Sequence, residues 1–288
     1  MKKIMFILTA GLALFAVPGA HAAHTLHFVV MSPTDPKEEL PKYEALNEYL
    51  RSVNPLLGDI KMRIAKDYPE AARLFKDGDA EGMFSGSFVA AVFITKGLAK
   101  PVARPLRADG GTMYRASIVA KEGTKPFGGI GDLRGKRVAY SPLASAGDVF
   151  LKGLLAPGEK PESVYAPMPV NSHQAALEAV MRGAADYAVV KSTVFAPARY
   201  PGLVLVGSGT EEHPDNTLIM PPAFFDEYGA LVAKVLLGLE ADTGEKAQAV
   251  KRAFGCKGFI ATAATDFVST FTVIRKARVD PKTFDFLF

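Results

Sequence analysis

Segments with strand and helix patterns alternate along the first hundred residues of the chain. Residues 25–31 and 60–65 have the apolar or alternating pattern of β-strands, and residues 40–50 carry apolar side chains at helical spacing. Asp67 opens a further helix that ends near Gly78. The order β-α-β-α predicts a largely parallel sheet, which places the chain in the α/β class.

A second α/β unit is predicted in the middle of the chain. The strand 137–140 leads into a helix over 148–155, and the strand 186–190 follows a helix that begins at His173. Each strand of this unit is followed by a cluster of polar residues, where an open α/β sheet places its ligand site.

The two units are predicted to be two lobes joined by two crossings of the chain. Residues 113–120 read as a strand that leaves the first lobe, and residues 210–220 return to it. We therefore expect residues 23–115 and 218–288 in lobe 1 and residues 116–217 in lobe 2. Two extended crossings make a hinge, so ligand binding by closure of the lobes is the expected mechanism.

The first 22 residues have the pattern of an export signal. Lys2 and Lys3 precede an apolar run over 4–17, and small residues before Ala22 form an Ala-x-Ala cleavage site. The apolar run is shorter than the roughly 20 residues that a transmembrane helix needs. We expect cleavage after Ala22 and a soluble mature protein in the periplasm.

Composition excludes several other classes of protein. The formal net charge of +4 falls to +2 once Lys2 and Lys3 are removed, which does not favour binding to nucleic acid. The single cysteine, Cys256, excludes an internal disulfide and a Cys-rich metal site, and the five histidines include no His-x-x-x-His pair. We therefore expect neither a metal nor a cofactor.

Several polar side chains lie at strand–helix junctions, the points where one element ends and the next begins. Ser145, His173 and Asp186 belong to successive βα units, so the three are expected to meet in one crevice. The N-terminus of a helix favours an anion there, because its first N–H groups lack partners and its dipole is positive. Ser85 or Ser87 either caps the next helix or holds a ligand oxygen.

Several of these segments resemble the phosphonate-binding family of periplasmic solute-binding proteins. The resemblance is carried by 114–119, by Asp-Leu-Arg-Gly-Lys-Arg-Val-Ala at 132–139, by the turn through Gly147, by Ser-His-Gln-Ala at 172–175 and by 183–186. It covers nearly all of the mature chain. It implies a type II periplasmic-binding fold, with two α/β lobes joined by a two-strand hinge and a ligand cleft between them. It also implies an ABC importer as partner, and a phosphonate, phosphate or phosphite group at the N-terminus of a second-lobe helix.

The anion-binding turn departs from the family pattern. The family turn resembles Asp-Pro-x-Ser-Thr-Ser-Gly, whereas residues 141–147 read Ser-Pro-Leu-Ala-Ser-Ala-Gly, so alanine replaces two of three hydroxyls. His173 matches the family's ligand histidine, Tyr68 is kept, and Phe88 stands where a ligand tyrosine is common. The positions of polar residues at strand–helix junctions, together with the family resemblance, predict these ligand-binding residues: Tyr68, Ser85, Ser87, Ser117, Ser145, Ala146, Gly147, His173, Asp186, Asp215 and Asn216.

The sequence therefore predicts a periplasmic protein that binds a small oxyanion for an ABC importer and is not an enzyme. One alternative is a periplasmic input protein for a membrane sensor histidine kinase, with a ligand such as an arsenic oxyanion. A remote alternative is a hydrolase in which Ser145, His173 and Asp186 form an acyl-transfer set; no Gly-x-Ser-x-Gly elbow surrounds Ser145.

Overall fold

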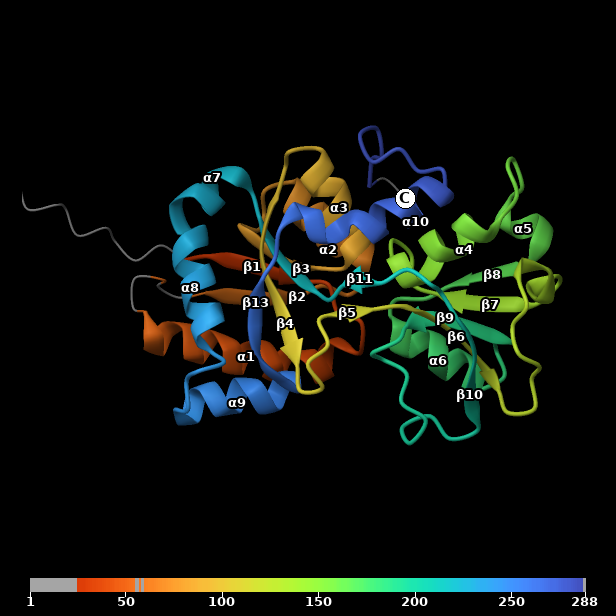
Figure 1. Cartoon of the computed structure of the whole chain (residues 1–288), viewed down its shortest axis with the longest axis horizontal. Coiled ribbons are helices and arrows are strands. Elements are labelled where there is room, and N and C mark those ends of the chain that lie inside the picture. Colours follow the sequence, from red (N-terminus) through yellow and green to blue (C-terminus); the bar gives the residue numbers. More distant parts are fainter. Residues whose placement is uncertain (1–24, 55–56, 58–59, 287–288) are drawn as a thin grey trace, which may run out of the picture.

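The computed structural model describes residues 25–54, 57 and 60–286, which fold into two α/β lobes side by side (Figure 1). The export signal predicted over residues 1–22 lies outside the described residues. Among the residues that are described, no helix is long and apolar enough to cross a membrane.

Lobe 1 is built on a six-stranded sheet. The three strands that come first in the sequence are parallel to one another, as the β-α-β-α order predicts. In spatial order the strands are β13 (Cys256–Ala261), β4 (Lys100–Arg107), β12 (Thr217–Met220), β3 (Gly82–Ser85), β1 (His27–Val30) and β2 (Lys61–Ile64). β12 pairs antiparallel with both β3 and β4, and β13 pairs antiparallel with β4.

Helices cover both faces of this sheet and bury a core on each side. One core lies under α1 (Pro36–Val53), α8 (Ala230–Gly238) and α9 (Glu245–Phe254), and the other under α2 (Tyr68–Lys76) and α3 (Ser87–Thr95). Short helical segments, α7 (Pro222–Phe224) and the π-turn Phe225–Gly229, precede α8.

Side-chain caps fix where two of these helices begin. The Asp35 carboxylate accepts the N–H of Lys37 before α1, and the Asp67 carboxylate accepts the N–H of Glu70 before α2. Each cap satisfies a donor that has no partner inside the helix, which stabilises a helix by about 1 kcal/mol.

Lobe 2 is built on a five-stranded sheet. In spatial order the strands are β10 (Leu203–Ser208), β6 (Ala116–Lys121), β9 (Tyr187–Lys191), β7 (Arg137–Tyr140) and β8 (Ala166–Pro169). β7 is parallel to β8 and β9, and β6 is antiparallel to β9 and β10. One face packs against α4 (Phe150–Leu154) and the other against α6 (His173–Met181); α5 (Pro161–Val164) and a 3-10 turn, Ile130–Leu133, complete the lobe.

A two-stranded ladder joins the lobes, formed by β5 (Met113–Tyr114) and β11 (His213–Pro214) (Figure 1). The chain enters lobe 2 through β5 and leaves it through β11. After β13, the 3-10 turn Ala264–Phe267 leads into α10 (Val268–Lys276), which contacts α3 of lobe 1 and α4 of lobe 2. The core beside α3 is therefore continuous with side chains of lobe 2, namely Leu143, Ala144 and Val149.

Candidate ligand site between the lobes

Three buried hydroxyl groups meet where the two lobes touch. Ser87 is the first residue of α3 in lobe 1, Tyr114 comes from β5 of the connection, and Ser145 comes from lobe 2. The Ser87 Oγ lies 3.1 Å from the Ser145 Oγ and is also hydrogen-bonded to the Tyr114 hydroxyl. The exposed fraction is 0% for Ser87, 5% for Tyr114 and 2% for Ser145. The structure thus brings together two of the predicted ligand residues, Ser87 and Ser145, with Tyr114 beside them.

Ser145 is positioned by an irregular turn before α4. Residues Ser145–Val149 form one π-helical turn, in which Ala146 (φ −93°, ψ 42°) and Gly147 (φ −148°, ψ −119°) depart from helical geometry. The Gly147 N–H donates to the Ala144 carbonyl at 3.0 Å, so it is not free to donate to an anion. The methyl group of Ala146 lies in the lobe 2 core beside α4. Of the three predicted ligand residues in this turn, Ser145, Ala146 and Gly147, Ser145 is the one whose side chain bonds to lobe 1, through Ser87.

Asp148 follows in the same turn and is buried against lobe 2. One carboxylate oxygen lies 3.2 Å from the Lys152 Nζ, and the other, Oδ1, has no hydrogen-bond partner among the described residues. Burial raises the pKa of Asp148, and the Lys152 charge offsets part of that rise. Burial raises the pKa of Tyr140 and of Tyr165, both lobe 2 residues, and the Asp148 charge adds to each rise.

His173 begins α6 and is almost fully buried, with 2% of its surface exposed. The Ser172 hydroxyl caps the helix by accepting the Ala175 N–H at 3.1 Å. Burial, with help from the Lys191 charge, lowers the pKa of His173 to about 3, so the ring is neutral at pH 7. Its Nδ1 accepts the Lys191 N–H at 3.4 Å, which leaves the ring proton on Nε2 as a donor. The Tyr68 ring of lobe 1 stands perpendicular to it at a centroid distance of 6.0 Å.

A buried ion pair lies next to these groups. The Lys191 Nζ, at the end of β9, contacts the Asp215 carboxylate, lies 3.0 Å from the Asn216 Oδ1, and sits 4.6 Å from the centre of the Tyr114 ring. Arg107 donates to the other Asp215 oxygen at 3.2 Å. Burial alone would raise the pKa of Asp215, but the charges of Lys191 and Arg107 and the Asn216 N–H hold it below its usual value.

Sequence reasoning predicted Asp215 and Asn216 but missed Lys191, Arg107 and Tyr114. Lys191 could have been found from the sequence, because it is a charged residue at the carboxyl end of an otherwise apolar strand. That end of a strand is where an open α/β sheet binds its ligand. Phe88 is not at the site: its ring packs edge-on against Phe284 in the lobe 1 core. Tyr114 instead places a tyrosine hydroxyl beside Ser87.

Asp186 does not meet Ser145 and His173, so the predicted crevice of those three residues is wrong. Asp186 precedes β9, whereas His173 contacts Lys191 at the opposite end of that strand. Five residues of extended chain separate the two ends by roughly 17 Å. Asp186 instead pairs with Arg137 at 2.9 Å, and that ion pair lowers its pKa. The hydrolase arrangement is therefore not formed.

Ser85 and Ser117 are both buried, but neither belongs to the group of bonded hydroxyls. The Ser85 Oγ donates to the Gly86 carbonyl at 3.0 Å at the end of β3. Ser117 lies in β6 opposite Val190 and next to Val119, whose side chain packs on the α6 side of the sheet. Among the described residues, neither serine side chain forms a hydrogen bond with another predicted ligand residue.

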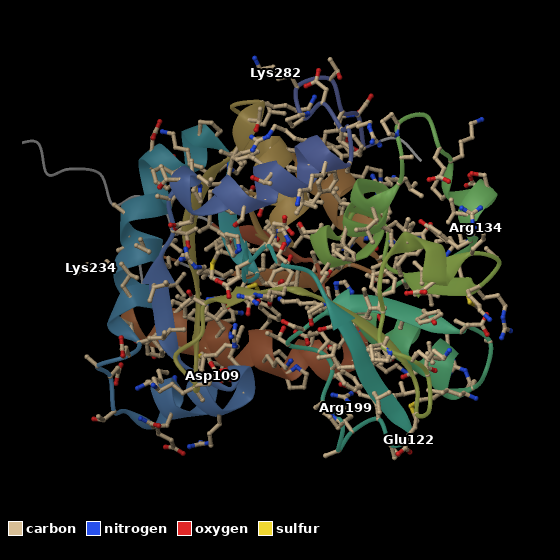
Figure 2. All side chains as sticks on the ribbon, turned by 45° about the vertical axis from the view of Figure 1, so that its right-hand side comes forward. Asp109, Glu122, Arg134, Arg199, Lys234 and Lys282 are labelled. Atoms are coloured by element: carbon tan, nitrogen blue, oxygen red, sulfur yellow. The ribbon has the colours of Figure 1, made fainter. Side chains whose placement is uncertain are left out.

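A cavity of about 260 Å³ opens from the Lys191 ion pair toward the surface between the lobes. Arg199, labelled in Figure 2, stands at its lobe 2 side and forms an ion pair with Glu38 of α1, with N–O distances of 2.6 and 2.8 Å. The cavity is lined by Pro33, Thr34, Glu39, Lys42, Tyr43, Pro105, Arg107, Lys191, Thr193, Val194, Arg199, Asp215, Asn216 and Phe254.

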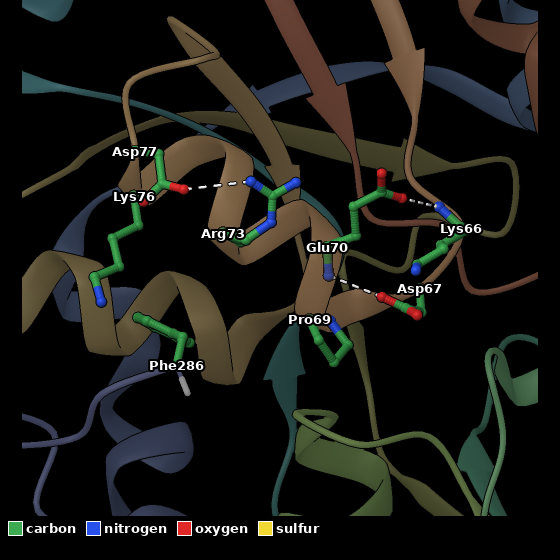
Figure 3. Close-up of a pocket in the computed structure, with 8 residues that line it drawn as sticks. All are labelled: Lys66, Asp67, Pro69, Glu70, Arg73, Lys76, Asp77 and Phe286. Atoms are coloured by element: carbon green, nitrogen blue, oxygen red, sulfur yellow. Dashed lines mark hydrogen bonds and ion pairs between the residues drawn. The ribbon is translucent and has the colours of Figure 1, made fainter. Parts of the chain in front are cut away.

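A larger hollow, about 440 Å³, lies on lobe 1 beside α2 (Figure 3). Three basic and three acidic residues line it, and one pair of them, Arg73 and Asp77, lies 3.4 Å apart. None of the predicted ligand residues lines it. Within the described ranges, no group of three or more His, Cys, Asp or Glu residues has the arrangement of a metal site.

The two lobes, the two-stranded connection and the polar groups buried between the lobes define a two-lobed binding protein. The family described as "ABC transporter, phosphonate, periplasmic substrate-binding protein" matches residues 28–267, and the chain belongs to that family. The family consists of substrate-binding proteins rather than enzymes. Its description names an ABC transporter, and nothing in it supports a sensor kinase as partner.

Solved structures share the fold at low sequence identity. A binding-protein component of an ABC phosphonate transporter from Pseudomonas aeruginosa is 14% identical, with a TM-score of 0.76 over 89% of this chain and 88% of that one. PhnD1 from Prochlorococcus marinus, in complex with methylphosphonate, is 16% identical, with a TM-score of 0.74 over 88% and 98%. The alkanesulfonate-binding protein of Xanthomonas axonopodis pv. citri, bound to MOPS, is 14% identical, with a TM-score of 0.60 over 93% and 96%. A search of curated proteins gives no match.

Proposed function

We propose that this protein captures a small oxyanion, of the phosphonate, phosphite or phosphate type, between its lobes and delivers it to an ABC importer. The observation that carries the proposal is the meeting of the Ser87, Tyr114 and Ser145 hydroxyls, which come from lobe 1, the connection and lobe 2. A ligand that takes hydrogen bonds from all three holds the lobes together. The methylphosphonate complex of PhnD1 and the MOPS complex of the alkanesulfonate-binding protein support an oxyanion as ligand of this fold.

The neighbouring groups suit an anion with several oxygens. Hydroxyls donate to a charged oxygen without carrying a charge themselves, and neutral His173 has its Nε2 proton free of the Lys191 contact. Tyr68 stands opposite His173 on lobe 1. Ser87 and Tyr114 supply hydroxyls on the lobe 1 side, which offsets the alanines at 144 and 146 on the lobe 2 side.

The location and the division into lobes form part of the proposal. Residues 1–22 direct export and are removed after Ala22, so that the mature protein is soluble in the periplasm, where the members of the family act. Lobe 1 comprises 23–115 and 218–288, and lobe 2 comprises 116–217. The strands of each sheet support this division to within one residue, since β12 of the lobe 1 sheet begins at Thr217.

Titration calorimetry with phosphite, methylphosphonate and phosphate tests the site. For the ligand that wild-type protein binds, Ser145→Ala and Tyr114→Phe should each weaken affinity by roughly ten to a hundredfold. A hydrogen bond to a charged group contributes about 1.5–3 kcal/mol. Ser52→Ala, which removes an exposed hydroxyl from α1, is the matched control and should bind as wild type does. Wild-type affinity in the double variant Ser145→Ala/Tyr114→Phe would remove the site from consideration.

A further inference from the structure

Lys191 is a buried lysine in the wall between the lobes, with 3% of its surface exposed. Its ammonium group is held on three sides, by the Asp215 carboxylate, the Asn216 amide oxygen and the face of the Tyr114 ring. The ring that it touches belongs to the same tyrosine whose hydroxyl is bonded to Ser87. The Tyr114 ring therefore separates a fixed positive charge, on one side, from the bonded hydroxyl groups.

The charges around Lys191 do not cancel. Lys191 and Arg107 share one carboxylate, that of Asp215. The neighbouring Lys42 is paired with Glu39 at 2.7 Å, and Arg199 is paired with Glu38, so each of these pairs is neutral. Arg107 also lies 3.4 Å from the Asp109 carboxylate, which is 70% exposed and therefore screened by water.

The other titratable groups near this ion pair add no negative charge. His173 is neutral, and burial raises the pKa of Tyr68 and Tyr114 above the usual value, so both phenols are neutral at pH 7. The part of the site that is shielded from water thus carries about one excess positive charge. An excess buried charge is costly, and an anionic ligand compensates it.

We propose that Lys191 determines which phosphonates the site accepts, by occupying the place where a ligand ammonium group would bind. A carboxylate, an amide oxygen and an aromatic face form a good receptor for an ammonium group, and Lys191 already fills it. Ligands whose organic group is uncharged are accepted, and ligands that carry an ammonium group are repelled by Lys191 and find Asp215 taken. This inference rests on the proposed function and specifies its ligand class.

Ethylphosphonate and aminomethylphosphonate test this directly, because they have nearly the same shape and differ by a methyl group against an ammonium group. Calorimetric titration of the mature wild-type protein at pH 7.5 should give at least tenfold tighter binding of ethylphosphonate. Lys191→Met keeps the length of the side chain and removes its charge. It should reduce that preference at least tenfold, because Asp215 is then available to the ligand ammonium and the positive charge that attracts the anion is gone.

Three further variants keep the outcome interpretable. Lys191→Arg keeps the charge and should keep the wild-type preference, and Lys234→Met, an exposed lysine labelled in Figure 2, should not change it. Asp215→Asn leaves Lys191 in place and should widen the preference for ethylphosphonate, which tests the inference even if Lys191→Met fails to fold. An unchanged preference in both Lys191→Met and Asp215→Asn overturns the role of Lys191 while leaving the proposed function intact. Binding of neither phosphonate, with no binding of phosphite or phosphate, overturns the proposed function itself.

Discussion

At the scale of single residues, Gly147 determines the shape of the turn that presents Ser145. A Cβ atom at position 147 would lie 2.6 Å from the Ser141 carbonyl oxygen and 2.9 Å from the Ala144 Cβ. The first of these is a backbone atom in the same turn, so it cannot move aside without changing the turn. Glycine is required here for close approach of the backbone and not for a positive φ angle, since its φ is −148°.

Gly147→Ala should therefore destabilise the protein and weaken binding together. We expect a loss of about 1–3 kcal/mol in the free energy of unfolding, typical of overpacking in a buried site, measured by urea unfolding. Gly238→Ala is the matched control, because no atom lies within 4 Å of the added Cβ and the residue is in α8. Alanine is favoured over glycine in helices, so the control should be neutral or slightly stabilising. Equal stability of the two variants would show that the turn adapts to a side chain.

At the scale of elements, two buried histidines beside the cleft make the stability of the protein depend on pH. His173 begins α6, and His213 lies in β11, where its Nδ1 is 3.0 Å from the Thr270 hydroxyl. Burial lowers the pKa of His173 to about 3 and that of His213 to about 4, in the latter case against the charge of Glu211. Above pH 6.5 both rings are neutral whether the chain is folded or not. Below pH 6.5 the unfolded chain takes up protons that the folded chain does not, so stability falls as pH falls.

Between pH 7 and pH 5 each histidine should cost about 2 kcal/mol of stability. Asp148, whose pKa burial raises, acts in the opposite direction and reduces the net loss. Comparison of wild type with His213→Asn isolates one histidine, because asparagine does not titrate. The loss of unfolding free energy between pH 7 and pH 5, from urea titrations, should be smaller by about 2 kcal/mol in the variant. The same loss in both proteins would show that His213 takes up its proton in the folded state.

The sequence pattern predicted most elements that hold the site, because strands β1, β2, β7 and β9 have apolar or alternating patterns and helices α1, α2 and α6 begin at side-chain caps. It did not predict β4 or β13. β4 contains Pro101 and Pro105, which cannot donate to a neighbouring strand, and prolines normally argue against an interior strand. Its pairing with β12 shifts register between Leu218 and Ile219, next to the partner of Pro101.

The candidate site was less predictable than the fold, because its contacts join residues distant in the chain. Ser87 and Ser145 are 58 positions apart, and Lys191 and Asp215 are 24 apart. Local pattern shows that a polar residue borders a strand, but it does not show which distant residue it contacts. Asp186 was expected at the cleft although it precedes its strand, and Lys191, which ends that strand, was overlooked.

At the scale of the whole molecule, the two lobes are held together by packing as well as by the connection. Leu143, Ala144 and Val149, which flank Ser145, lie in the lobe 1 core that α10 also contacts. Arg278, just after α10, donates to the Leu155 carbonyl at the end of α4 at 3.1 and 3.2 Å. Because the turn that carries Ser145 packs against lobe 1, its geometry depends on how the lobes meet, and ligand binding is expected to stabilise the whole fold.

A thermal-shift screen of the refolded mature protein tests the central claim most directly, because refolding removes any ligand carried through purification. The panel contains phosphate, phosphite, methylphosphonate, ethylphosphonate, sulfate, arsenite and arsenate. A ligand at a thousand times its dissociation constant stabilises the folded state by about 4 kcal/mol, which raises the Tm of a protein of this size by roughly 8–16 °C. We predict a rise of this size with at least one phosphorus oxyanion and its loss in Ser145→Ala/Tyr114→Phe. An unchanged Tm across the panel would contradict oxyanion capture.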